Sequence, residues 1–157
     1  MGKSYERGLA TRRKVLGKEW VDRAIGTATP FNADFQKMIT SYAWDGIWNR
    51  KGLSHKVRRM LVIAMTTALG RWEEFRLHVR AALASGDLAE DDVREVLMQA
   101  AIYCGVPAAN TGFHEARDVI AELEGGGRSR SARKAGKRAP AKSAKPAKSA
   151  KSKRKRG

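Results

Sequence analysis

The sequence predicts an all-α, single-domain bundle of about six helices, followed by a disordered C-terminal tail. Three observations carry this prediction. Apolar residues recur every three or four positions along most of the first 124 residues, which is the period of an amphipathic helix. No segment alternates apolar and polar residues with period two, so no sheet is expected. From residue 125 onward the chain lacks aromatic and large aliphatic side chains, so nothing there offsets the entropy of ordering.

Two helices are expected in the first 50 residues. Residues 5–25 are helix formers with charged side chains interspersed, and Thr29-Pro30 separates them from the next helix. In that second helix the apolar side chains fall at i, i+3, i+4 and i+7, which places them on one face: Phe35, Met38, Ile39 and Tyr42. Lys51-Gly52 then predicts a turn.

Two further helices are expected between residues 54 and 86. Ser54 is placed to cap the first of them, and Gly70 is placed to break or bend it. Its apolar stripe consists of Val57, Leu61, Ala64, Met65 and Ala68. The second helix begins after Arg71 and stops at Ser85-Gly86.

The last two predicted helices lie between residues 90 and 125. The acidic run Glu90-Asp91-Asp92 suits the positive end of a helix dipole, and Gly105 is placed to terminate that helix. Pro107 opens the final helix, and the triplet Gly125-Gly126-Gly127 closes the domain. We therefore expect a helical domain over residues 1–124 and a disordered basic tail over residues 125–157.

The net charge of +16 is concentrated in the tail. Residues 128–157 contain 14 Lys or Arg and no acid, which leaves 18 basic against 16 acidic residues in the first 127. Such a segment is expected to bind polyanions weakly and with a steep salt dependence, so a nucleic-acid or polyanion-binding protein is the alternative function. Against it, the tail has no aromatic residue for base stacking, and the folded part lacks the basic excess of a binding groove.

Cysteine content and hydropathy indicate the compartment. The single cysteine, Cys104, excludes a disulfide within one chain and suits a reducing compartment. Its neighbours Ile102, Tyr103 and Val106 predict a buried structural thiol. No apolar stretch approaches the roughly 18 residues of a membrane span, and the N-terminus lacks the apolar region of a secretory signal. A cytoplasmic protein without membrane contact is therefore expected.

One helical segment, RWEEFRLHVR, carries the candidate reactive side chains. Glu74 and His78 are four residues apart and share one face, with Arg71 about one turn before them. An ordinary Glu-His pair on a solvated face would have the same spacing. The neighbours Leu77 and Val79 indicate burial, which is costly for charges unless they are paired. We therefore predict a site tuned for proton transfer.

The other two histidines are predicted to have no catalytic function. His55 lies in the first turn of its helix, and His114 lies among polar residues of the last helix. A surface or capping role is expected for both. No group of His, Cys, Asp and Glu has the spacing of a known zinc motif, so the sequence implies no metal.

Four segments of the chain carry a resemblance to a known family: RRKVLGKEWVDRA, FQKMITSYAWDGIWNRKGLSHKVRRMLVIAMTTALGR, EEFRLHVRAAL and VREVLMQAAIYCGVPAAN. Together they resemble the carboxymuconolactone decarboxylase family over about residues 7–124. Peroxidase members of the wider alkylhydroperoxidase D-like superfamily carry Cys-x-x-Cys-x-x-x-His on the corresponding helix. The same spacing here reads Arg71, Glu74 and His78. Thiol peroxidase chemistry is therefore excluded at this site, while the histidine is kept.

The resemblance implies conversion of 4-carboxymuconolactone to 3-oxoadipate enol lactone with loss of CO2, in the protocatechuate branch of aromatic catabolism. It also implies an alkylhydroperoxidase D-like all-α subunit, a ring-like homo-oligomer that is typically a hexamer, and no cofactor. The sequence departs from the family pattern in its basic tail, which leaves catalysis untouched. It also departs at Trp72-Glu73, which could alter the rim of the pocket.

The implied substrate suggests a role for each candidate on the RWEEFRLHVR segment. Electrons released with CO2 can flow onto the lactone carbonyl, so the substrate is its own electron sink and needs neither pyridoxal phosphate nor thiamine. We expect His78 to be the proton donor or the oxyanion partner. Glu74 is expected to orient the imidazole ring and to set its pKa.

Arginines and tryptophans are expected to bind the rest of the substrate. Arginine suits a dicarboxylate because its planar fork can pair with a carboxylate bidentately. Arg71 ranks first by its position on the helix face, and Arg58 and Arg80 are the other candidates. Trp44 and Trp48 could supply an apolar wall for the departing carboxylate, and they are equally well explained as core or subunit interface.

Overall fold

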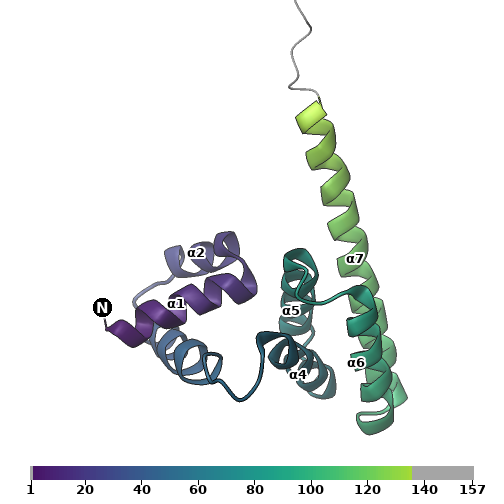
Figure 1. Cartoon of the computed structure of the whole chain (residues 1–157), viewed down its shortest axis with the longest axis horizontal. Helices are drawn as coiled ribbons and strands as arrows, with labels where there is room; N and C mark the ends of the chain where they lie inside the picture. Colours follow the sequence, from purple (N-terminus) through teal and green to yellow (C-terminus); the bar gives the residue numbers. More distant parts are fainter. Residues whose placement is uncertain (1, 136–157) are drawn as a thin grey trace, which may run out of the picture.

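The computed structural model describes the backbone of residues 2–135 and the side chains of residues 2–125. All regular structure in this part is helical, which confirms the all-α fold class (Figure 1). The elements are α1 (Lys3–Leu16), α2 (Lys18–Gly26), α3 (Ala33–Ile39), the π-helix η1 (Thr40–Ile47), α4 (His55–Ala68), α5 (Trp72–Ser85), α6 (Glu90–Tyr103) and α7 (Val106–Ala135).

Two hydrophobic cores lie on either side of α5. The first joins α1, α2 and η1 and consists of Val15, Leu16, Val21, Trp44 and Trp48. The second joins α4 to α7 and consists of Ile63, Phe75, Val79, Ala82, Leu88, Val93, Leu97, Ala116 and Val119. Figure 1 shows the corresponding division, with α1 and α2 on one side of the molecule and α4 to α7 on the other. Helix α5 contributes to both cores, because Val79 is buried in the second while Leu77 packs against the first.

Helix α1 lies unusually close to η1. A Cβ atom built on Gly8 would lie 2.0 Å from the backbone carbonyl oxygen of Thr40, so only glycine fits there. Arg7 pairs with Asp45 through two hydrogen bonds of 3.0 and 2.7 Å. Arg12 is buried and donates from Nη1 to the Thr40 hydroxyl at 3.1 Å. These contacts hold η1, which carries Trp44, against α1.

Helix boundaries follow most of the predicted signals. Ser54 caps α4, since its Oγ accepts a hydrogen bond from the backbone N–H of Val57 at 3.3 Å. The prediction of one helix over residues 5–25 is wrong, because Gly17 adopts a φ of 90° and separates α1 from α2. A left-handed backbone at this position is open to glycine and costly for other residues.

The last helix is longer than the sequence predicts. Helix α7 continues through the glycine triplet to Ala135. Each glycine costs a helix only about 1 kcal/mol relative to alanine, and the Arg and Ala residues that follow favour extension. The rest of the predicted disordered tail, residues 136–157, lies outside the described residues. Its disorder and its binding to polyanions stay predictions.

Several apolar side chains point to solvent. The buried residues of α4 are Arg59, Ile63, Thr66 and Thr67, while the apolar stripe recognised in the sequence is largely exposed, at 39% for Val57, 40% for Leu61 and 55% for Met65. On α3 and η1, Phe35, Met38 and Tyr42 are exposed as well. None of the helices between residues 2 and 135 is long and apolar enough to cross a membrane. Exposed apolar area of this kind usually marks an interaction surface.

Cys104 is exposed, so the prediction of a buried thiol is wrong for the single chain. Its apolar neighbours Ile102, Tyr103 and Val106 are themselves exposed, at 78%, 79% and 68%. Apolar neighbours in sequence therefore did not indicate burial at the junction of α6 and α7.

The contact between α1 and η1 can be tested with Gly8→Ala. The added methyl group would overlap the Thr40 carbonyl, so the two helices must separate, and overpacking of this kind costs about 1–3 kcal/mol. Urea unfolding should show this loss of stability. Gly26→Ala is the matched control, since a Cβ there meets no atom within 4 Å, and it should leave stability unchanged or raise it. Equal stabilities of the two variants would contradict the close packing.

Candidate active site

His78 lies in the middle of α5, on the side of the helix between the two cores. The imidazole is mostly buried, and its Nδ1 atom has no hydrogen-bond partner among the described residues. Burial is the main cause that lowers the pKa of His78 from 6.5 to about 4, the positive charge of Arg59 lowers it further, and the charge of Glu74 opposes them. At neutral pH the ring is therefore uncharged.

The imidazole lies flat on an aromatic stack. The rings of Trp48 and His78 have centroids 6.2 Å apart and an interplanar angle of 13°. The Trp44 ring stacks on the Trp48 ring, with centroids 5.0 Å apart and an interplanar angle of 24°. Both tryptophans are buried. The stack places two large apolar rings beside the candidate reactive group.

The π-helix positions this stack. The backbone N–H of Trp48 donates to the carbonyl of Ala43, five residues earlier, at 3.0 Å. Such wide turns often occur at functional sites. Trp44 in η1 and Trp48, the residue directly after η1, both face the core beside α5.

His55 belongs to the same cluster, although the sequence placed it at the surface. Its Nε2–H donates to the backbone carbonyl of Trp48 at 3.2 Å. Its ring meets the Trp48 indole edge-on, with centroids 5.9 Å apart. His55 therefore supports the aromatic stack from α4. His114, by contrast, is exposed on α7, as predicted.

Arg59, whose charge acts on His78, is a candidate site residue that the sequence reasoning missed. It is fully buried, with an exposed fraction of 0%, and its Nε and Nη2 atoms pair with Asp87 Oδ2 at 3.0 and 2.8 Å. Arg59 precedes Ile63 by four residues and Thr66 by seven, so it shares the buried face of α4 with them. The sequence alone does not tell which face of α4 is buried.

The predicted site residues are only partly brought together. Glu74 is exposed and makes no hydrogen bond to His78 within the described chain, so it acts on the imidazole through its charge. Arg71 is exposed at the N-terminal end of α5 and has no hydrogen bond from its side chain to another described residue. Arg58 donates to the carbonyl of Arg50 at 3.0 Å. Arg80 pairs with Glu122 of α7 and so lies apart from the stack.

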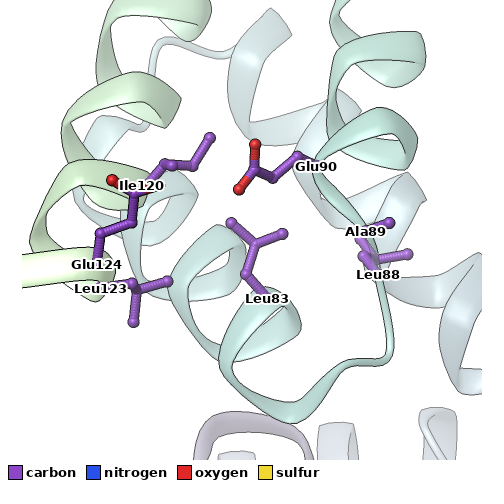
Figure 2. Close-up of a pocket in the computed structure, with 7 residues that line it drawn as sticks. All are labelled: Leu83, Leu88, Ala89, Glu90, Ile120, Leu123 and Glu124. Atoms are coloured by element: carbon purple, nitrogen blue, oxygen red, sulfur yellow. The ribbon is translucent and has the colours of Figure 1, made fainter. Parts of the chain in front are cut away.

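A pocket of about 390 Å³ lies elsewhere, between the end of α5, the start of α6 and α7. Figure 2 shows its lining, which is aliphatic apart from Glu90 and Glu124. It contains none of the predicted site residues. This pocket therefore gives no support to the predicted site.

The buried, neutral state of His78 makes stability depend on pH. The folded-state pKa is about 4, while an unfolded chain titrates near the ordinary value of about 6.5. The unfolded state therefore binds more protons between these values, so stability is fully present above pH ~6.5 and is lost as the pH falls toward ~4. At ~1.4 kcal/mol per pKa unit the loss is on the order of 3 kcal/mol.

This dependence can be isolated by comparing the wild type with His78→Phe, which keeps an aromatic ring against Trp48. Urea unfolding at pH values between 4 and 8 should show a steeper loss of stability on acidification for the wild type. Parallel curves for the two proteins would contradict a buried neutral imidazole.

Comparisons with known proteins identify the family of the chain. Residues 33–118 match the model of the carboxymuconolactone decarboxylase family. The chain is 38% identical over 119 residues to a 4-carboxymuconolactone decarboxylase of Acinetobacter baylyi, a match that covers 76% of this chain and 88% of that relative. It is also 38% identical over 104 residues to a nitrosuccinic acid decarboxylase of Metarhizium robertsii, covering 66% and 72% of the two chains. The chain therefore belongs to the carboxymuconolactone decarboxylase family.

Proposed function

We propose that this chain decarboxylates 4-carboxymuconolactone to 3-oxoadipate enol lactone and CO2, a step of protocatechuate catabolism. The observation that carries the proposal is the neutral His78 ring, mostly buried against Trp48 with Nδ1 left without a partner, in a chain of this family. Two relatives named as decarboxylases, one acting on the carboxylated lactone and one on nitrosuccinic acid, support loss of CO2 as the shared reaction.

The substrate itself accepts the electrons. When the bond to the departing carboxylate breaks, its electron pair moves through the ring double bond onto the lactone carbonyl oxygen, and CO2 leaves. The resulting dienolate takes up a proton at the ring carbon next to the carbonyl, which gives the enol lactone. The protein must therefore stabilise negative charge on one oxygen, exclude competing reactions and supply a proton.

His78 suits the first of these tasks. A neutral imidazole donates a hydrogen bond from its N–H, and such a donor in a buried site stabilises a developing oxyanion more strongly than in water. Because its pKa is lowered to about 4, an imidazolium is scarce at neutral pH, so of the two roles expected for His78 we favour oxyanion partner over proton donor. Glu74 tunes this group, since its charge raises the pKa of the imidazole.

Substrate carboxylates would be held by arginine. Arg71 is the first candidate, since its side chain makes no hydrogen bond to other described residues and it stands one turn before Glu74 on α5. Arg58 is second, because its Nε atom is buried without a partner. Arg80 ranks last because Glu122 already occupies its guanidinium. The stacked Trp44 and Trp48 would provide an apolar wall for the departing carboxylate.

The working form is proposed to be a cytoplasmic homo-oligomer, a hexamer by resemblance. The apolar side chains of α4 that face outward would then be covered by other subunits. An interface would also explain why α4 turns its polar residues Arg59, Thr66 and Thr67 toward the interior of its own subunit.

The test is ultraviolet-monitored conversion of enzymatically generated 4-carboxymuconolactone, with a metal chelator present throughout. We expect turnover by the wild type and a loss of about 10²-fold or more in kcat for His78→Ala. Glu74→Ala should change kcat less than His78→Ala does, because the carboxylate acts on the imidazole only through its charge. His114→Ala, on the exposed face of α7, is the matched control and should turn over normally. An inert wild type, or full activity in folded His78→Ala, would refute the proposal.

A further inference from the structure

Arg59 is the fully buried cation of the second core. Its side-chain exposure is 0%, against 39% for its partner Asp87. Burying an ion pair is costly unless its geometry is good and the remaining donors find acceptors. Here Nε and Nη2 bond to Asp87, and Nη2 also lies 3.4 Å from Ser85 Oγ.

These contacts do not involve the third guanidinium nitrogen of Arg59. Nη1 of Arg59 is buried and has no hydrogen-bond partner among the described residues, and the same holds for Nδ1 of His78. A buried donor without a partner is destabilising, and native proteins contain few of them. The packed helices α4 and α5 carry these two atoms and one more in the described part of the chain, Nε of Arg58. The atoms of Arg59 and His78 call for a common explanation, because the charge of Arg59 acts on His78.

Arg59 and His78 lie on helices that pack against each other. His78 and Ser85 are seven residues apart, which places them two turns apart on the same face of α5. Arg59 reaches this face at Ser85. Its charge is also close enough to His78 to act on the imidazole, where it ranks after burial among the causes that lower the pKa.

Resting on the proposed function, we propose that Arg59 Nη1 and His78 Nδ1–H together bind the lactone oxygen that becomes negative during decarboxylation. Asp87 and Ser85 are the positioning residues of the guanidinium. This assignment requires the imidazole tautomer with its proton on Nδ1. A single oxygen can accept both N–H groups, and the new bonds would satisfy both buried donors at the point where charge develops.

The developing oxyanion fits this pair better than a carboxylate of the bound substrate does. A cation on the departing carboxylate would stabilise the ground state and slow the reaction, whereas donors aimed at the dienolate oxygen act mainly in the transition state. Asp87 offsets the guanidinium charge in the free protein, which limits the attraction for other anions.

The test uses full-length Arg59→Met and Arg59→Gln. The matched control is Arg94→Gln, since Arg94 is an exposed arginine of α6 that pairs with Asp91 and Glu95. For both Arg59 variants we expect kcat to fall about 10²–10³-fold while KM changes little. Arg59→Gln keeps a hydrogen-bond donor for Asp87, so it replaces Arg59→Met in the test if Arg59→Met does not fold. The control should match the wild type.

A second readout is the pKa of His78, followed by NMR of histidine-labelled protein. Removing the neighbouring positive charge should raise it in both Arg59 variants, which tests whether the two groups share a site. The fall in kcat at unchanged KM tests the catalytic role of Arg59. Unchanged kcat, a rise in KM alone, or an unchanged pKa of His78 in a folded variant would overturn the assignment. If the wild type has no turnover, the proposed function fails, while the pKa comparison still decides whether Arg59 and His78 share a site.

Discussion

The flat packing of His78 on Trp48 is the contact on which the site depends. It requires η1 to present the indole toward α5, and η1 is held there by the close approach of Gly8 to the Thr40 carbonyl and by the pair between Arg7 and Asp45. On its other side α5 is fixed by the second core through Phe75, Val79 and Ala82. The imidazole is thus held between two independently packed parts of the chain.

Burial in this position decides the chemistry available to the side chain. A neutral imidazole beside a guanidinium can donate hydrogen bonds without carrying a charge of its own, and both groups are in place before substrate binds. A decarboxylation whose substrate carries its own electron sink needs stabilisation of one oxygen more than it needs a strong acid. The arrangement and the family membership therefore support the same type of reaction.

The sequence was sufficient for the fold class, while His78 and Glu74 as the centre of the site stay a prediction. Helix ends at Ser54 and Gly86 have local causes, a capping hydroxyl and a left-handed glycine, that can be recognised in the chain. The four-residue spacing of Glu74 and His78 likewise needs only the geometry of one helix. The role of Gly17 was missed, because a glycine within a helical pattern is compatible with both a continued and a broken helix.

The burial of Arg59 could not be predicted in the same way. Sequence patterns assign the apolar side of α4 to the core, but in this chain that side is largely exposed and the side with Arg59, Thr66 and Thr67 is buried. Which face turns inward depends on packing between elements, and in the proposed oligomer also on other subunits.

The most direct test of this account is a pH titration of the His78 ring in the wild-type full chain, followed by NMR of the ring nitrogens and assigned with His78→Phe. The account predicts an imidazole that stays neutral from pH 8 down to about pH 5 and takes up its proton near the value of about 4 given by its burial. A midpoint at the ordinary value of about 6.5 would mean that the ring is solvated and charged, and would contradict the buried neutral imidazole at the centre of the site.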